Sequence, residues 1–391
     1  MKERTEWINN LRTAITILVV AHHASLSYTT FAKFDSTRYI NSTHPIVDTQ
    51  RSLALDIFEN FNDIFFMSLM FLIGGFFLNQ SFIKKGFYDF LKDRFYRLAI
   101  PFIFSTFFMW IAYFPPYIVA TNSYDFISHI FDFFSQQDWP SGPPWFIWVL
   151  FVFNFIFALT YKFFPFLPSS YNSIGYPLNN KRILFSLFIF FLLIYISFVP
   201  LAMSVGIGTW IGYGPLDFQL PRILQYFLFF ALGIYLGKID FNNNLFSINS
   251  FLVKNSFIWL AVSIFFYSLL TLNDYFGFLR SLVLNNILPE LIAWLVYFSI
   301  YLLSCLFSCL TFLTITKKYF NSSNQFIEFL NNNAYLLYLI HFVFLIWFQF
   351  LFTFFSLHPI IKFFFVFIFS LLASNLLSVY LRKIKIIRIY L

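Results

Sequence analysis

The sequence carries little charge for its length. Asp, Glu, Lys and Arg make up 11% of its 391 residues, whereas hydrophobic residues make up 60% and Phe alone occurs 65 times. A water-soluble protein cannot cover its surface with so few charged groups, so a soluble fold is excluded. The first apolar run, residues 8–28, is followed by two more with no small-residue cleavage pattern between them. We therefore interpret it as a retained helix and not as a cleaved signal peptide.

Cysteine and glycine are also scarce. The only two cysteines, Cys305 and Cys309, lie in one apolar run, where they are expected to pack as small hydrophobic side chains and to form no disulfide framework. Among the 12 glycines, one cluster between Gly206 and Gly214 lies in a polar connection. Because this cluster lacks the strand-then-helix context of a nucleotide-binding loop, it predicts a flexible turn. Acidic residues are few as well, and no bound metal is predicted.

Apolar runs long enough to cross a bilayer follow one another along the whole chain. They predict an all-α fold, a polytopic membrane helix bundle of about ten transmembrane helices. We expect a single membrane-embedded domain over residues 1–391, with no appended soluble domain. The runs fall near residues 8–28, 61–79, 98–120, 144–165, 183–203, 220–238, 255–273, 290–316, 333–355 and 360–381.

The positions of Lys and Arg orient this bundle. Most of the 25 fall in alternate connections, and cytoplasmic loops hold such residues in excess, so the N and C termini are both predicted to be cytoplasmic. This asymmetry also explains the formal net charge of +8, and nucleic acid is not an expected partner. Arg222 lies at the outer membrane edge, and the outer segments hold only Lys33, Arg38, Arg51, Arg280 and Lys362.

The first apolar run contains ionisable groups, which are costly inside a membrane and are therefore functional candidates. Arg12 and His23 are 11 residues apart, a spacing that returns to nearly the same helical face at a separation of roughly 16 Å. His22 points about 100° away from His23. A neutral imidazole is suited to take a proton from a sugar hydroxyl. The alternative is that Arg12 is a snorkelling anchor and His23 a hydrogen-bonding group between helices.

Two arginines stand directly before the third predicted helix. Arg94 and Arg97 are three residues apart on one helical face. Ordinary inside-positive charge accounts for Lys84, Lys85 and Lys92 in the same loop. Planar guanidinium groups suit phosphate and pyrophosphate, so the pair favours a phosphorylated donor bound from the cytoplasm.

The remaining candidates lie toward the outer side or in the ninth predicted helix. Trp145 opens the fourth helix, either as part of an interfacial aromatic belt or in contact with a substrate. Tyr338 and His341 share one face of the ninth helix, close enough to bond each other or a common ligand, and a purely structural role is equally open. Three carboxylates that could orient an imidazole precede or enter the second helix: Asp56, Glu59 and Asp63.

Together these features resemble the integral-membrane acyltransferase family three, which contains bacterial O-acetylases of lipopolysaccharide and peptidoglycan and the succinyl transferase of periplasmic glucans. The more specific matches are the Arg-x10-His of the first helix and the Arg-x-x-Arg before the third. The stretches FLIGGFF, GPPWFIW and YLIHF are softer matches, and all follow the family's order over nearly the whole chain. The chain departs from the family at Gly74-Gly75, where Ser-Gly is usual, and at Ser68, where many members are acidic.

The resemblance implies a membrane-bound O-acyltransferase of the bacterial inner (cytoplasmic) membrane. An acyl group, acetyl or succinyl, would pass from cytoplasmic acyl-coenzyme A (acetyl-CoA or succinyl-CoA) to a hydroxyl of an extracytoplasmic or lipid-linked carbohydrate acceptor. Arg12, Arg94 and Arg97 would hold the phosphates of the nucleotide. The lipid bilayer is the surrounding partner, and the membrane core would act either alone or with a periplasmic or membrane helper protein.

Within this resemblance His23 is the expected centre of the chemistry. It would act as a general base on the acceptor hydroxyl, or it would carry the acyl group as a transient acyl-imidazole. The full set of candidate catalytic residues is His23, His22, His341 and Asp63.

Two other classes of membrane protein share parts of this pattern. A transporter or flippase of an envelope carbohydrate would also have about ten helices and buried ionisable groups, but we find no inverted repeat of broken helices in the sequence. A membrane glycosyltransferase would be expected to carry acidic residues for metal or lipid-phosphate chemistry, in which this chain is poor. Stabilisation by coenzyme A would separate the acyltransferase from both.

Overall fold

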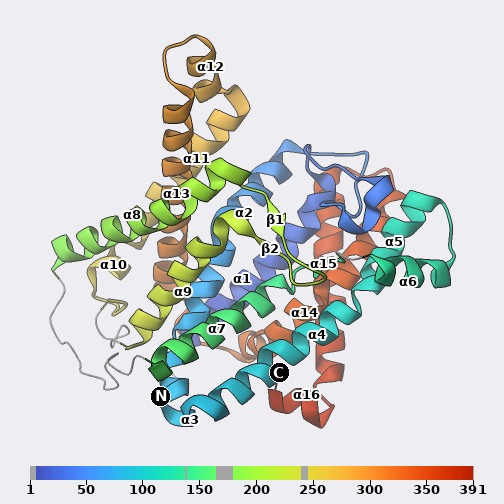
Figure 1. Ribbon diagram of the computed structural model, residues 1–391, viewed down its shortest axis with the longest axis horizontal. Helices are drawn as coiled ribbons and strands as arrows, with labels where there is room; N and C mark the ends of the chain where they lie inside the picture. The colour runs from blue at the N-terminus through green and yellow to red at the C-terminus, as the bar shows by residue number, and fades with distance from the viewer. Residues whose placement is uncertain (1–5, 137–138, 164–178, 239–244, 391) are drawn as a thin grey trace.

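The structure is a computed structural model that describes residues 6–136, 139–163, 179–238 and 245–390 (Figure 1). These residues are almost wholly helical, as predicted, with one two-stranded antiparallel sheet. The elements in chain order are α1 (Glu6–Ser25), η1 (Leu26–Tyr28), η2 (Ser36–Asn41), α2 (Leu53–Gly75), α3 (Leu78–Arg94), η3 (Phe95–Ala99), α4 (Ile100–Phe107), α5 (Met109–Thr121), α6 (Phe126–Ser135), α7 (Trp145–Phe163), α8 (Asn180–Val205), β1 (Trp210–Ile211), β2 (Phe218–Gln219), η4 (Leu220–Arg222), α9 (Ile223–Lys238), α10 (Phe251–Lys254), α11 (Ser256–Phe276), α12 (Phe278–Leu284), α13 (Glu290–Tyr319), α14 (Gln325–Thr353), α15 (Pro359–Leu381) and α16 (Lys385–Tyr390).

Nine helical stretches in the described ranges are long and apolar enough to cross a membrane. They coincide with nine of the ten predicted runs. The remaining run forms α1, a helix of 20 residues that is less apolar because it contains Glu6, Arg12 and two histidines. The large apolar side chains that the outer helices expose match the surroundings that lipid tails provide. The chain is therefore a multi-pass membrane protein.

Helix α2 begins earlier than predicted, at Leu53 and not near residue 61. The predicted run placed Asp56 and Glu59 before the helix and Asp63 near its start. In the structure all three lie within α2 at positions i, i+3 and i+7, which share one helical face. Each has a polar partner in the protein, so the helix continues through them.

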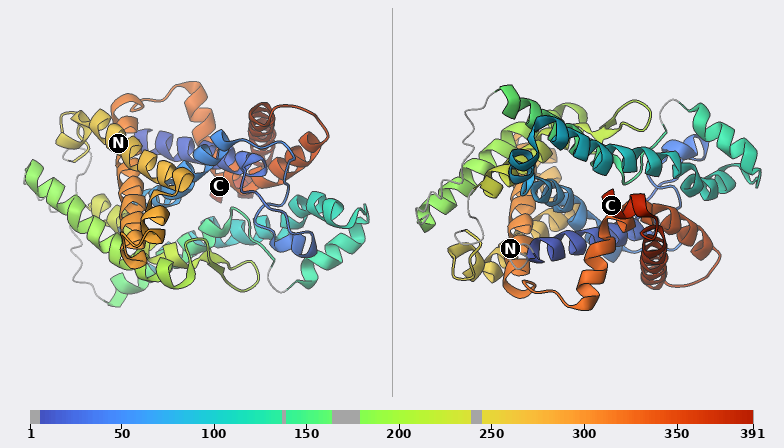
Figure 2. Two further views of the ribbon diagram at one scale, coloured as in Figure 1. Left: turned by 90° about the horizontal axis from the view of Figure 1, so that it is seen from above. Right: turned by 90° about the horizontal axis from the view of Figure 1, so that it is seen from below.

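Helix α1 runs through the interior, where it packs against α2 and α14. Figure 2 shows α8 and α11–α13 on one side of α1 and α5 and α6 on the other. The start of α1 and the end of α15 lie at the same end of the bundle. Asn10 bonds the carbonyl of Phe320 in the connection from α13 to α14, and Arg382 bonds that of Asn332 in the first part of α14. We call this the lower end, as it appears in Figure 1. The cytoplasmic placement of the termini stays a prediction from the charge pattern.

Helices α2 and α9 pack through glycines, which let the two backbones approach closely. A Cβ atom on Gly75 would collide with the carbonyl oxygen of Phe230, and one on Gly233 would collide with that of Leu72. Gly237 lies one turn further along, which makes the small-xxx-small pattern typical of membrane helix contacts. This contact holds α9, and with it Arg222 at its entrance, against the face of α2.

The glycine contact predicts a difference between two equivalent substitutions. Gly233→Ala should lower the stability of the folded protein by about 1–3 kcal/mol, because the new methyl group meets backbone that cannot move aside. Gly208→Ala is the matched control, since no atom lies within 4 Å of the added Cβ. Thermal unfolding of both variants in detergent tests this. Equal melting temperatures would contradict the packing described here.

Candidate active site

A cavity of about 940 Å³ lies at the end of α1 opposite the lower end, and we call it the upper cavity. The segment between α1 and α2 and the β1–β2 hairpin line one part of it. Ionisable groups of α1 and α2 line another part: His22, His23, Glu59 and Asp63. The cavity therefore brings together two of the three predicted intramembrane histidines and two of the candidate carboxylates.

His23 has one ring nitrogen held and the other available. Its Nδ1 lies 2.8 Å from the carbonyl oxygen of Val19. Because a carbonyl can only accept, Nδ1 carries the proton and Nε2 keeps a lone pair. Gln349 Nε2 donates to the carbonyl oxygen of His23 at 2.8 Å and so fixes this last turn of α1. His23 is partly exposed, whereas His22 and His341 are buried, so it is the most accessible of the three imidazoles.

The other two histidines flank His23 from different elements. The ring of His22 lies 5.1 Å from that of His23, and its Nε2 is 3.7 Å from Glu59 Oε1. The ring of His341 lies 5.5 Å from His23, and its Nδ1 is 2.8 Å from the carbonyl oxygen of Tyr338. The sequence did not show which of the three carboxylates lies next to a histidine. In the structure it is Glu59, and the histidine is His22.

Tyr338 and His341 lie close together but do not bond through their side chains. Their ring centroids are 6.0 Å apart, and each uses a backbone partner. The Tyr338 hydroxyl donates to the carbonyl oxygen of Pro143, two residues before α7. This bond ties α14 to the start of the helix that Trp145 opens.

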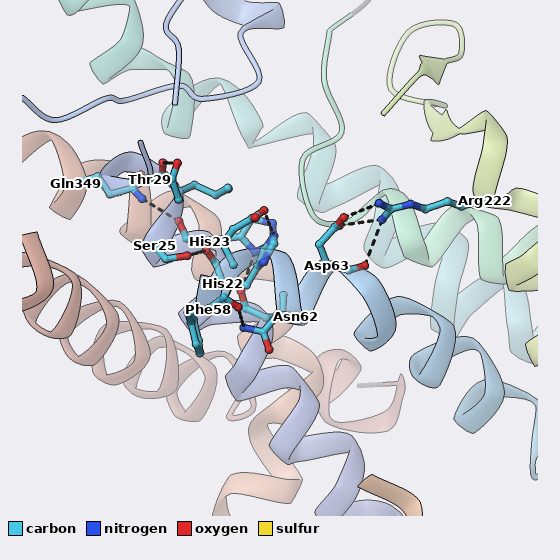
Figure 3. Close-up of polar contacts among 12 residues, drawn as sticks. His22, His23, Ser25, Thr29, Phe58, Asn62, Asp63, Arg222 and Gln349 are labelled. Carbon is cyan, nitrogen blue, oxygen red and sulfur yellow. Dashed lines mark hydrogen bonds and ion pairs between the residues drawn. The ribbon is translucent and has the colours of Figure 1, made fainter. Parts of the chain in front are cut away.

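Asp63 does not touch a histidine ring by hydrogen bonding; it pairs with Arg222. Arg222 Nη1 and Nη2 donate to the two carboxylate oxygens at 2.9 and 2.5 Å, and Nη1 also reaches the Asp63 carbonyl. Figure 3 shows Asp63 between the histidines and Arg222. The guanidinium also stands over the ring of Tyr301, at 5.8 Å from its centroid. Such a two-point pair is well suited to hold charge inside a bundle.

Contacts with α2 and α15 help to hold the segment from Thr29 to Ser52 over the upper cavity. Asp56 of α2 accepts from the backbone and the hydroxyl of Thr30. Lys362 of α15 donates to Asp48 at 2.6 Å, and both side chains are almost fully buried. Asp56 therefore positions the segment and not an imidazole.

The β1–β2 hairpin forms the opposite part of the lining. Trp210 pairs with Gln219 and Ile211 with Phe218. The glycine cluster was predicted to be a flexible turn. Gly212 and Gly214 lie in the turn between the two strands, and Gly206 and Gly208 precede β1. The ring of Trp210 stands perpendicular to that of Trp145 at 5.4 Å, so the predicted Trp145 does line the upper cavity.

A second cavity of about 260 Å³, the lower cavity, lies along the same helix. Arg12 and Thr16 of α1 line it, and Val19 and His23 line the upper cavity. These four positions follow the i, i+4, i+7, i+11 stripe of one helical face, as predicted for Arg12 and His23. Tyr338 lines both cavities and so stands between them.

The two arginines before the third predicted helix separate in the structure. Arg94 lines the lower cavity, and its Nη2 donates to Ser81 at 3.1 Å. Arg97 follows in the π-helical turn η3, where its Nε bonds Asp93 at 3.0 Å and its side chain is 47% exposed. Arg97 is not among the residues that line the cavity. Arg12 and Arg94 are thus brought together, and Arg97 points to the surface beside them.

Sequence reasoning missed three residues of the upper cavity. Arg222 was placed at the membrane edge without a role, since its partner lies 159 residues away in the chain. Gln349 and Asp217 carried no motif. A polar residue within an apolar run was the available signal for Gln349. Asp217 carried no such signal, because it lies in a connection.

Comparison with known proteins gives one match. A family model described as an acyltransferase domain matches residues 5–379, nearly the whole chain. No curated protein and no solved structure gives a match. The matched range includes every residue of both cavities named above.

Asp217 predicts a pH-dependent difference in stability. It lies between α8 and α9, outside the spanning helices, and burial raises its pKa to about 6 while the Ser141 hydroxyl donates to it. The folded protein therefore keeps a proton that the unfolded chain has lost, and this advantage disappears as the pH rises through the folded pKa. Between about pH 5 and pH 7.5, wild type should lose up to about 2 kcal/mol relative to Asp217→Asn.

Thermal unfolding of the two proteins over this pH range in detergent measures the effect. The Asn oxygen can still accept from Ser141, so the comparison isolates the charge. A difference in melting temperature that stays constant with pH would show that Asp217 titrates normally.

Proposed function

Because this chain belongs to the integral-membrane acyltransferase family 3, we propose that it carries an acetyl or succinyl group from acyl-coenzyme A to a carbohydrate hydroxyl, with His23 as the general base. The membrane acyltransferase activity follows from family membership. We propose the identities of the donor, the acceptor and the base. We place the donor on the cytoplasmic side of a bacterial inner membrane and the acceptor on the other side, as the distribution of Lys and Arg predicts.

The continuous α1 stripe from Arg12 to His23 carries this proposal. At its lower end Arg12 and Arg94 present guanidinium groups to a narrow cavity, where they suit the phosphates of coenzyme A. At its upper end His23 presents an unprotonated Nε2 to the wider cavity. The extended arm of the donor would follow Thr16 and Val19 past Tyr338, so that the thioester reaches the imidazole.

The chemistry requires one proton to move twice. His23 Nε2 takes the proton of the acceptor hydroxyl as its oxygen attacks the thioester carbonyl carbon. The carbon–sulfur bond then breaks, and the same Nε2 returns the proton to the leaving thiolate. The bond from Nδ1 to Val19 keeps the ring in the tautomer that this cycle needs. A transient acyl-imidazole would form on the same nitrogen.

The rim of the upper cavity suits a sugar. Trp139, Trp145 and Trp210 line it, and their rings offer apolar faces for the C–H groups of a pyranose. Asp217 and Gln219 on the hairpin offer acceptors and donors for hydroxyl groups. This mixture of flat aromatic rings and neutral or acidic polar groups supports a carbohydrate acceptor.

The role of His23 is tested by substitution. His23→Gln should reduce acyl transfer by about 100-fold or more, because glutamine cannot take the proton. His358→Gln is the control, since this exposed imidazole caps α15 and lies outside both cavities. Transfer of radiolabelled acetyl from acetyl-CoA to envelope glycans in membranes measures the effect, with melting temperature as a check on folding. Undiminished transfer by a folded His23→Gln protein would remove the base assignment.

The lower cavity predicts unequal roles for the paired arginines. Arg94→Ala should lower the affinity for coenzyme A about tenfold, because a cavity-lining guanidinium is lost. The shift in melting temperature that coenzyme A causes in detergent measures this affinity. Arg97→Ala should weaken it less, since Arg97 is exposed and paired with Asp93. If Arg97→Ala has the larger effect, the phosphates bind at the surface and not in the lower cavity.

A further inference from the structure

The upper cavity presents a carboxylate, and not a cation, to a group that arrives beside His23. Asp63 and Arg222 form one ion pair, but the cavity meets its two members unequally. The Asp63 side chain is 32% exposed, whereas that of Arg222 is 5% exposed. Figure 3 shows the same order, with Asp63 nearer the histidines and Arg222 behind it.

Arg222 has little left to offer a second anion. Nη1 and Nη2 already bond both carboxylate oxygens of Asp63. Its Nε has no bonding partner, but this atom is buried. Because both terminal nitrogens already hold Asp63 and the Arg222 side chain is only 5% exposed, a new carboxylate would have to displace Asp63 to reach them.

The other charges around the upper cavity do not replace this cation. Among the described residues, Arg38 is the only other Lys or Arg in the lining, and it is exposed on η2. His44 also lines the cavity, but burial lowers its pKa. A further carboxylate, that of Asp217, lines the same space. The interior of the cavity therefore disfavours an added negative charge.

Resting on the proposed function, we infer that this enzyme accepts donors with short uncharged acyl groups, such as acetyl, and rejects donors whose acyl group ends in a carboxylate, such as succinyl. The cavity of about 940 Å³ has room for either group, so volume does not discriminate between them. The charge of Asp63 does discriminate, because the acyl group of a donor held at His23 would lie in the cavity that the Asp63 carboxylate also lines. Asp63 thus determines donor specificity, and Arg222 holds it in place.

Wild-type protein in detergent tests the inference with three donors. Butyryl-CoA and succinyl-CoA have acyl chains of the same carbon number, and only the second carries a terminal charge. Displacement of bound radiolabelled acetyl-CoA gives the affinity of each. Acetyl-CoA and butyryl-CoA should bind similarly, and succinyl-CoA should bind at least about tenfold more weakly than butyryl-CoA.

Substitution of Asp63 should reverse the preference. In Asp63→Asn the guanidinium of Arg222 loses its anion, and the carboxylate of a succinyl group can take its place. The affinity ratio of succinyl-CoA to butyryl-CoA should then rise by about tenfold or more. Asp217→Asn is the matched control, because it removes one charge from the same cavity without releasing an arginine. Its ratio should change by no more than about twofold.

The outcomes separate this inference from the proposed function. If no coenzyme A derivative binds wild type, the proposed function fails and the inference falls with it. If acetyl-CoA binds and succinyl-CoA binds as tightly as butyryl-CoA, the function stands and the inference is wrong. An equal rise of the ratio in Asp63→Asn and Asp217→Asn would show that the total charge of the cavity, and not the Asp63–Arg222 pair, selects the donor. If Asp63→Asn does not fold, the wild-type comparison still decides.

Discussion

One face of α2 carries three carboxylates into a helix bundle, and the low dielectric there requires a partner for each of them. Asp56 fixes the segment that covers the upper cavity, Glu59 stands beside His22, and Asp63 holds Arg222. Each partner comes from a different part of the chain. The contacts of these three carboxylates therefore hold α1, the first long connection and the start of α9 around one space. The upper cavity is what remains between them.

That constraint also explains why the two ends of α1 differ in chemistry. Near Arg12 and Arg94, side chains of α1, α2, α7 and α14 leave only the narrow lower cavity of about 260 Å³. At the other end of α1, the β1–β2 hairpin and the segment from Thr29 to Ser52 line the wider upper cavity. Tyr338 stands where the narrow space meets the wide one, tied to the carbonyl of Pro143. In the proposed function, a long donor that enters from the lower end would have to pass this ring to reach His23.

The sequence predicted those features that depend on local periodicity. The spacing of Arg12 and His23 placed both on one helical face, and the apolar runs coincide with the nine spanning stretches. It could not predict features that depend on distant partners. Asp63 was a candidate neighbour of a histidine, and only the fold could show that it forms an ion pair with Arg222. The exposed position of Arg97 has a similar cause, because the π-helical turn that rotates it away from Arg94 leaves no mark in residue spacing.

The central claim is that one face of α1 leads an acyl donor from the arginines to His23. A structure of the protein with bound acetyl-CoA would test it most directly. We expect the phosphates beside Arg12 and Arg94, the Tyr338 ring moved aside, and the thioester within hydrogen-bonding reach of His23 Nε2. Phosphates bound near Arg38, with the arm entering from the hairpin side and the lower cavity without ligand, would contradict the account.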